Sequence, residues 1–166
     1  MSVRRFWGFP NPVNEVAARL VATGVALLTG SVALFAATWL LVPITYGFVA
    51  RVVAGPRLSP LGLLVTRILV PRLPLTPRYG PGPPKRFAQM IGAMLAVTAS
   101  VLAFGFQQPG AARIVAAVIA AAATLEAAFG LCVGCRIFAG LMRLGVIPAA
   151  VCAECADLRH TETAAW

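Results

Sequence analysis

The chain has 166 residues, of which 60% are hydrophobic and 11% charged, and its mean hydropathy is +0.86. Soluble domains are roughly 45–50% apolar and about 25% charged, so this composition excludes an ordinary soluble domain and predicts an integral membrane protein. The net charge of +9 would suggest a nucleic-acid partner in a soluble chain. Here Lys and Arg flank apolar segments, so we expect contact with the headgroups of membrane lipid and no nucleic acid.

The first apolar region runs over residues 16–53, 38 residues in all. As a single helix it would be ~57 Å long, against a hydrocarbon core of about 30 Å, so the chain must reverse within it. Thr29-Gly30-Ser31 is the predicted turn. It separates spanning helices over residues 14–28 and 32–51, the first capped by Asn14.

A basic connection follows over residues 51–86, rich in proline and without any acidic residue. Within it, residues 61–70 are apolar but too short to span a bilayer, which predicts a helix lying at the membrane interface. Residues 76–85 are predicted to form an irregular loop because of their many Pro and Gly.

Two further spanning helices are predicted over residues 87–106 and 111–131, separated by a Gln-Gln-Pro-Gly turn. The predicted fold is therefore all-α: a single membrane domain over residues 1–166, built as an integral membrane four-helix bundle of two antiparallel hairpins. A cysteine-bearing tail over residues 132–166 follows the bundle. Basic residues gather in the N-terminal arm, the middle connection and the tail, which predicts that the N- and C-termini are cytoplasmic.

Two charged residues fall within predicted membrane helices, Arg19 and Glu126. A charge at the centre of a membrane helix costs roughly 2.5–3.5 kcal/mol, so such residues usually face the bundle interior and have a partner. Both lie near the cytoplasmic ends of their helices, so they are predicted to pair with each other; the alternative for Arg19 is that it extends to the interface. Glu126 is also six residues before Cys132 and is expected to approach the cysteine site.

All four cysteines lie in two Cys-x-x-Cys pairs, Cys132–Cys135 and Cys152–Cys155, separated by sixteen residues. A cytoplasmic location excludes structural disulfides, because the cytosol keeps thiols reduced. One alternative is a four-cysteine zinc site, whose spacing fits. The intervening residues, however, have the pattern of an amphipathic helix rather than of a zinc ribbon.

The other alternative is thiol chemistry at the first pair. If Gly134 separates the last membrane helix from a tail helix, Cys135 lies at the N-terminus of the tail helix beside Arg136, and both features lower a thiol pKa. The acidic residues Glu154 and Asp157 oppose ionisation of the second pair.

Three segments of the chain, Ser59-Pro60, PPKRFAQ (Pro83 to Gln89) and EAAFGLCVGC (Glu126 to Cys135), resemble the bacterial membrane family catalogued as domain-of-unknown-function family 4395. The resemblance implies a small multi-helix protein of the bacterial inner membrane, in a family without an established activity. It also implies an association with thioredoxin-like or sulfurtransferase proteins. Many relatives have an amide where Glu126 stands and only the first cysteine pair, which favours a dithiol over a zinc site.

We therefore expect a cytoplasmic dithiol with Cys132, Cys135 and Glu126 as catalytic residues, exchanging electrons or sulfur with a thioredoxin-like or rhodanese-like partner. The alternative is a non-enzymatic membrane subunit or anchor whose tail is folded by zinc on Cys132, Cys135, Cys152 and Cys155. A third hypothesis is transport of a small thiol or sulfur anion, with Arg19 and Arg113 as contacts, which requires a homo-oligomer or a larger membrane complex.

Overall fold

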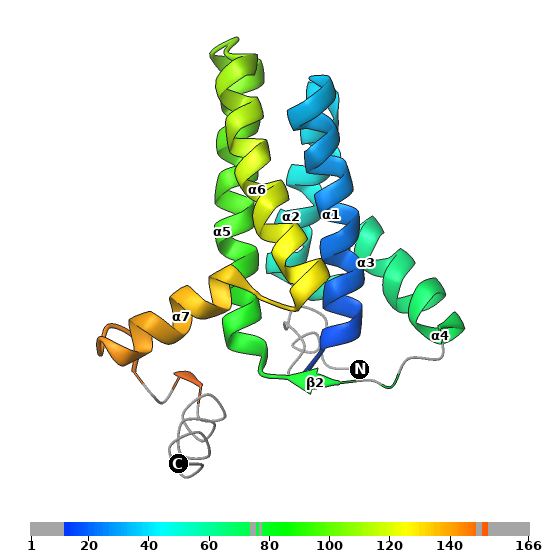
Figure 1. Cartoon of the computed structure of the whole chain (residues 1–166), viewed down its shortest axis with the longest axis vertical. Helices are drawn as coiled ribbons and strands as arrows, with labels where there is room; N and C mark the ends of the chain where they lie inside the picture. Colours follow the sequence, from blue (N-terminus) through cyan, green and yellow to red (C-terminus); the bar gives the residue numbers. More distant parts are fainter. Residues whose placement is uncertain (1–11, 74–75, 77, 149–150, 153–166) are drawn as a thin grey trace.

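The structure, a computed structural model, describes residues 12–73, 76, 78–148 and 151–152. In this part of the chain it is all-α, with one pair of two-residue strands and seven labelled α-helices, of which α3 and α4 are continuous through a π-helical turn and form one of six helical segments (Figure 1). The elements in chain order are β1 (Val13–Asn14), α1 (Glu15–Phe35), a 3₁₀ turn (Thr38–Leu40) leading into α2 (Leu41–Ala54), a second 3₁₀ turn (Gly55–Arg57), α3 (Pro60–Leu64), a π-helical turn (Val65–Leu69), α4 (Val70–Arg72), β2 (Tyr79–Gly80), α5 (Gly82–Ser100), a second π-helical turn (Val101–Gly105), α6 (Pro109–Phe129) and α7 (Val133–Arg143).

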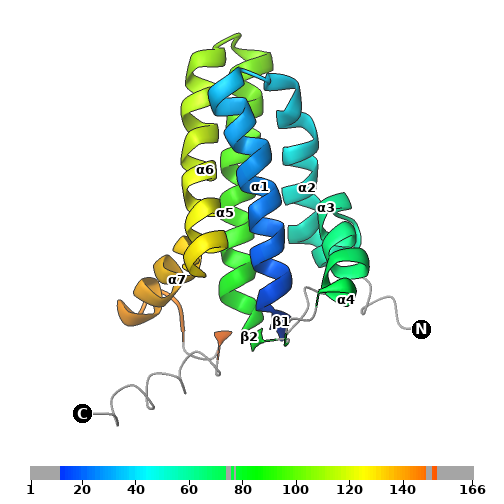
Figure 2. The ribbon, with the colours of Figure 1, turned by 45° about the vertical axis from the view of Figure 1, so that its right-hand side comes forward.

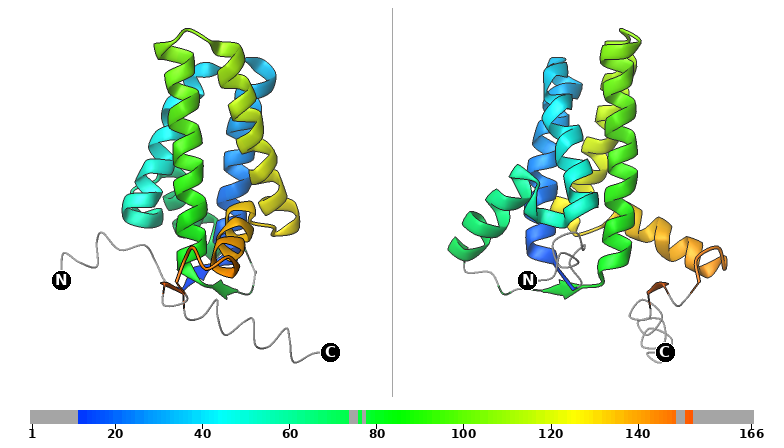
Figure 3. Two further views of the ribbon diagram at one scale, coloured as in Figure 1. Left: turned by 90° about the vertical axis from the view of Figure 1, so that its left-hand side faces the viewer. Right: turned by 180° about the vertical axis from the view of Figure 1, so that it is seen from behind.

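The helices α1, α2, α5 and α6 form the predicted bundle of two antiparallel hairpins (Figure 3). The two hairpins pack face to face, with α1 against α6 and α2 against α5. Within the second hairpin, α5 packs against α6. Three helices are long and apolar enough to cross a membrane, Glu15–Phe35, Gly82–Gly105 and Pro109–Phe129. The fourth, Thr38–Ala54, is apolar but shorter. The fold therefore supports a membrane location on three helices rather than four.

The first reversal of the chain lies later than predicted. α1 continues to Phe35, and the chain turns at Ala36, whose φ is 55°. Thr29 and Ser31 stay helical because their hydroxyls donate to the carbonyls of the preceding turn, at 2.7 and 2.8 Å. A hydroxyl that donates to a carbonyl of the preceding turn has its hydrogen bond within the helix, so the helix can continue through Thr or Ser in an apolar setting. The predicted bounds 14–28 and 32–51 are wrong at this turn, whereas the Asn14 cap is confirmed, its side chain accepting from two backbone N–H groups.

The interior of the bundle is built largely from small residues. Buried alanines occur on α5, on the π-helical turn that follows it and on α6: Ala96, Ala99, Ala103, Ala112, Ala116 and Ala123. Small side chains allow membrane helices to approach closely, which is where their packing energy arises. Large apolar side chains instead lie exposed on the outer faces, including Leu34, Met94 and Ile114. A surface of this kind suits a lipid environment rather than water.

We call one end of the bundle the base. The described strands and the helices outside the bundle lie there, namely β1, β2, α3, α4 and α7 (Figure 2). Here β1 pairs with β2 in an antiparallel register, joining the starts of α1 and α5. The loop predicted over residues 76–85 is thus partly ordered, and it also contains the start of α5. The predicted helix 61–70 is confirmed as helical over residues 60–72, capped by the Ser59 hydroxyl. This segment and α7 extend from the base in opposite directions.

Candidate functional site at the base of the bundle

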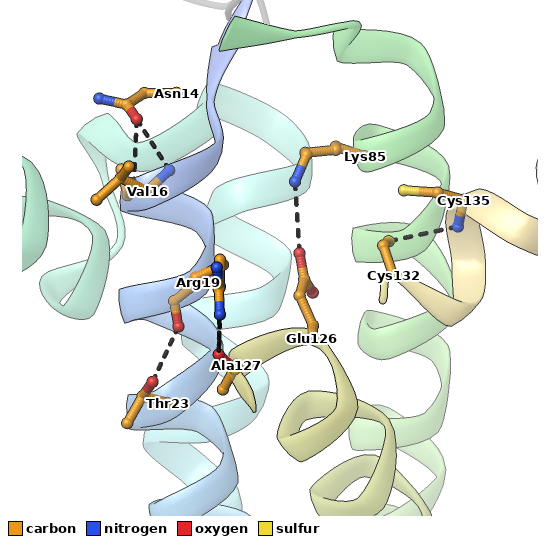
Figure 4. Close-up of polar contacts among 10 residues, drawn as sticks. Asn14, Val16, Arg19, Thr23, Lys85, Glu126, Ala127, Cys132 and Cys135 are labelled. Atoms are coloured by element: carbon orange, nitrogen blue, oxygen red, sulfur yellow. Dashed lines mark hydrogen bonds and ion pairs between the residues drawn. The ribbon is translucent and has the colours of Figure 1, made fainter. Parts of the chain in front are cut away.

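The C-terminus of α6 is closed by a glycine cap and by an arginine from α1. Gly130 has φ 70°, and its N–H donates to Glu126 O at 3.0 Å while the next N–H reaches Leu125 O at 3.3 Å. The bond from Gly130 to Glu126 is that of an αL cap, which requires a left-handed residue at Gly130. Arg19 donates to Ala127 O and Ala128 O at 3.0–3.2 Å, so its charge faces the negative end of the helix (Figure 4).

Glu126 pairs with a different cation from the one predicted. Lys85 Nζ, from the first turn of α5, lies 3.6 Å from Glu126 Oε1, with both side chains mostly buried. The predicted pairing of Arg19 with Glu126 is wrong, because the guanidinium is taken by the carbonyls at the end of α6. The Lys85–Glu126 pair therefore ties α5 to α6 directly beside the cysteines, as Figure 4 shows.

Cys132 is the N-cap residue of α7. Its backbone is extended, with φ −79° and ψ 104°, and its sulfur accepts from Cys135 N at 3.3 Å. A thiol thus occupies the position where Ser, Thr, Asp or Asn usually accepts from the free N–H groups of a first turn. The helix break lies at Gly130 rather than at the predicted Gly134, which is buried inside α7. Cys132, and not Cys135, is therefore the residue at the positive end of the helix.

The electrostatic environment separates the two thiols. The Cys135 thiol hydrogen-bonds to Cys132 and lowers the pKa of Cys132, an effect that outweighs burial and the nearby Glu126 carboxylate, both of which raise it. The pKa of Cys135 is raised, first by the same hydrogen bond and then by burial. Donation to a sulfur stabilises its thiolate, whereas the donor must keep its proton. Cys132 is thus the thiol poised to ionise, and Cys135 is its donor.

Both cysteines open onto a basic cleft of about 360 Å³. Among the described residues that line it, Lys85, Arg136 and Arg143 are cationic and Glu15 alone is acidic. Cys132 and Cys135 are partly exposed free cysteines. A thiolate here is within reach of a partner and lies in a positive field that suits anionic or electron-rich sulfur groups.

Close packing holds α7 against the start of α5. Gly134 lies so near Ala88 that an added Cβ would stand 2.6 Å from Ala88 Cα. Four residues further on, the Phe138 ring packs on Phe87 with centroids 5.5 Å apart and planes tilted by 58°. The dithiol is consequently held by two rigid helices rather than by a loop.

The second cysteine pair is described only in part. Cys152 is 4% exposed and packs with Phe138 and Met142. It is disulfide-bonded in this structure, contrary to the expectation of a reduced thiol at this position. Cys155 lies outside the described residues. Among the residues described, no group of three or more His, Cys, Asp or Glu is arranged to hold a metal ion.

The two arginines proposed for anion transport both have backbone partners. Arg19 closes α6 as described, and Arg113 Nε donates to Ala33 O at 3.0 Å near the opposite end of the bundle. Sequence reasoning missed Lys85 at the site, because it assigned this residue to a loop. The proline pair before it, Pro83-Pro84, is the signal of a helix start that would have placed it on α5.

Fold and site together define an all-α protein with membrane-length apolar helices and a dithiol at one end of its bundle. The chain belongs to the family described as Domain of unknown function (DUF4395), which matches residues 13–143, from β1 to the end of α7. The matched range contains Cys132 and Cys135 and ends before Cys152. No curated protein and no solved structure matches the chain.

Proposed function

We propose that this protein is a membrane dithiol carrier that exchanges electrons or sulfur with a thioredoxin-like or sulfurtransferase partner at the base of its bundle. The observation that carries the proposal is the position of Cys132 as the N-cap of α7, where its Sγ accepts from the Cys135 backbone N–H at 3.3 Å and lies with Cys135 on an open basic cleft. The range of the family match supports the first pair as the working one, because it includes that pair alone.

In the proposed reaction the Cys132 thiolate attacks one sulfur of a partner disulfide. The new S–S bond joins Cys132 to the partner, and the other partner sulfur leaves as a thiolate that takes up a proton. Cys135 then loses its proton and attacks the Cys132 sulfur, which forms the Cys132–Cys135 disulfide and releases the second partner thiol. The partner gains two electrons and the dithiol loses two. The same steps in reverse, with a reduced partner, return the Cys132–Cys135 disulfide to the dithiol.

For the orientation, we propose that the base faces the bacterial cytoplasm, with Thr38–Ala54 as a fourth crossing. Described basic residues gather at the base, among them Arg78, Lys85, Arg136 and Arg143, whereas Arg113 lies toward the other end. This asymmetry satisfies the positive-inside rule. In a cysteine-free variant, a membrane-impermeant maleimide should label Gln108→Cys in intact cells and a cysteine restored at 132 only after lysis. The opposite labelling would reverse the orientation.

A thiol titration combined with metal analysis of the purified protein tests the function. The proposal expects metal-free protein in which mild oxidation removes two free thiols and forms a disulfide between Cys132 and Cys135, located by peptide mapping. Cys135→Ser should trap a mixed disulfide on Cys132, whereas Cys132→Ser should trap far less. Stoichiometric zinc with unreactive thiols would instead support a zinc-folded anchor and overturn the proposal.

A further inference from the structure

Arg51 is the single buried charged residue in the described part of the chain, with 6% of its surface exposed. It lies in the last turn of α2, which runs to Ala54, so it belongs to the bundle, three residues before the end of the helix whose predicted end was Arg51 itself. Its guanidinium stacks over the Phe48 ring at 4.6 Å from the centroid. Its Nε is buried without any hydrogen-bond partner among the described residues. A buried donor of this kind is usually satisfied, so its geometry calls for a ligand.

Arg51 lines a cavity of about 260 Å³ that reaches Cys132 from inside the bundle. Gln89 lines the same cavity, and its buried Oε1 also has no hydrogen-bond partner among the described residues. Turning this amide by 180° presents its two N–H donors in place of the oxygen. The cavity thus offers the donors of a guanidinium and of an amide, with small apolar side chains such as Ala17 and Ala18 around them.

The charges lining this cavity do not balance. Lys85 and Glu126 form an ion pair with each other, which leaves the Arg51 cation as the excess positive charge. Glu126 attracts Arg51 electrostatically but lies beyond salt-bridge distance. The charged groups that act on the Cys132 thiol are Glu126 and Lys85, so Arg51 does not serve that thiol. Burying an unmatched guanidinium is strongly unfavourable unless an anion joins it.

We propose that this cavity is a binding site for a monovalent oxyanion held by the Arg51 guanidinium and the Gln89 amide. A guanidinium presents parallel N–H donors that match two oxygens on one face of a planar or tetrahedral oxyanion. The size of the cavity admits a small free anion, such as a carboxylate, or the phosphodiester of a lipid headgroup entering from the base. The site stands whether or not the dithiol exchanges with a partner.

The test is anion-dependent thermal unfolding of the purified full chain in neutral detergent, at constant ionic strength with gluconate as the balancing anion. Formate and nitrate serve as the free anions, and mixed micelles containing phosphatidylglycerol supply the headgroup. We expect a saturable rise in the melting temperature of the wild type with at least one of these probes. A response to formate and nitrate identifies a free anion, and a response to phosphatidylglycerol alone identifies the lipid.

Three variants assign the effect to Arg51. Arg51→Met should abolish the response, and Arg51→Lys, which keeps the charge without the fork, should weaken affinity by about ten- to a hundredfold. Arg113→Met makes the same change at the other end of the bundle and should respond as the wild type does. A wild type whose melting temperature responds to no probe overturns the site. An Arg51→Lys variant with the affinity of the wild type also overturns it, and this variant gives the answer even if Arg51→Met does not fold.

Discussion

Replacing Gly134 by Ala tests whether the close packing of α7 on α5 affects the stability of the protein and the pKa of the Cys132 thiol. The new Cβ would stand 2.5 Å from Ala88 Cβ and 2.6 Å from Ala88 Cα, whereas ordinary contacts begin at 3.4 Å. Because one of these atoms belongs to the backbone, no side-chain rotation relieves the contact, and α7 must move away from α5. Overpacking of this kind costs about 1–3 kcal/mol. The displacement also disturbs the cap at Cys132, so the Cys132 thiolate should form at higher pH than in the wild type.

Gly140 provides the matched control within the same helix. Nothing lies within 4 Å of a Cβ added there, so Gly140→Ala should stabilise the helix by roughly 0.5–1 kcal/mol through the backbone entropy of glycine. Thermal unfolding in detergent and the pH dependence of iodoacetamide labelling measure both effects. If Gly134→Ala matched Gly140→Ala in both measurements, the close seat of α7 would have no role in stability or in thiol activation.

Three further predictions concern the charges at the base. In the wild type, partial alkylation followed by peptide mapping should label Cys132 at lower pH than Cys135, because the pKa of Cys132 is lowered and that of Cys135 is raised while each has the other as its hydrogen-bond partner; equal profiles would contradict the assignment of roles. Glu126→Gln removes a charge that raises the pKa of Cys132, so alkylation of Cys132 should shift to lower pH. Lys85→Met removes a charge that lowers this pKa, so alkylation should shift to higher pH, and shifts in the same direction in the two variants would contradict the reasoning. Arg19→Gln removes the charged donor at the end of α6 and should destabilise the protein by about 1–2 kcal/mol in thermal unfolding; an unchanged melting temperature would show that the cap closes the helix alone.

Much of the fold follows from the sequence because length and hydropathy act over whole segments. The two hairpins follow from apolar runs of a suitable length and the tail helix from an amphipathic pattern, and both signals are insensitive to single residues. The position of the first turn was not predictable in this way. Thr29, Gly30 and Ser31 have low helix propensity in water. In an apolar setting, however, the hydroxyls of Thr29 and Ser31 donate to carbonyls of the preceding turn, and the helix continues until the chain turns at Ala36.

The sequence places Cys132 and Cys135 together at the end of the bundle, but it did not predict the geometry around them. The more acidic of the two thiols depends on which residue caps α7. That in turn depends on Gly130 adopting φ 70°, which sequence alone did not distinguish from a break at Gly134. The pairing of Glu126 depends on where α5 begins, since this start brings Lys85 to within 3.6 Å. Long-range register of this kind is set by packing and not by local propensity.

The short pairing of β1 with β2 has a mechanical consequence. Val13 and Asn14 bond to Tyr79 and Gly80 where the two hairpins begin, and Glu15 N adds a bond of 2.7 Å to Arg78 O. Both hairpins are therefore clamped at the end that holds the thiols, while their closed turns at the other end are joined by no strand among the described residues. The clamp thus sets the spacing of the starts of α1 and α5 next to the thiols, whereas the far end is joined by side-chain contacts such as that of Arg113 with Ala33 O.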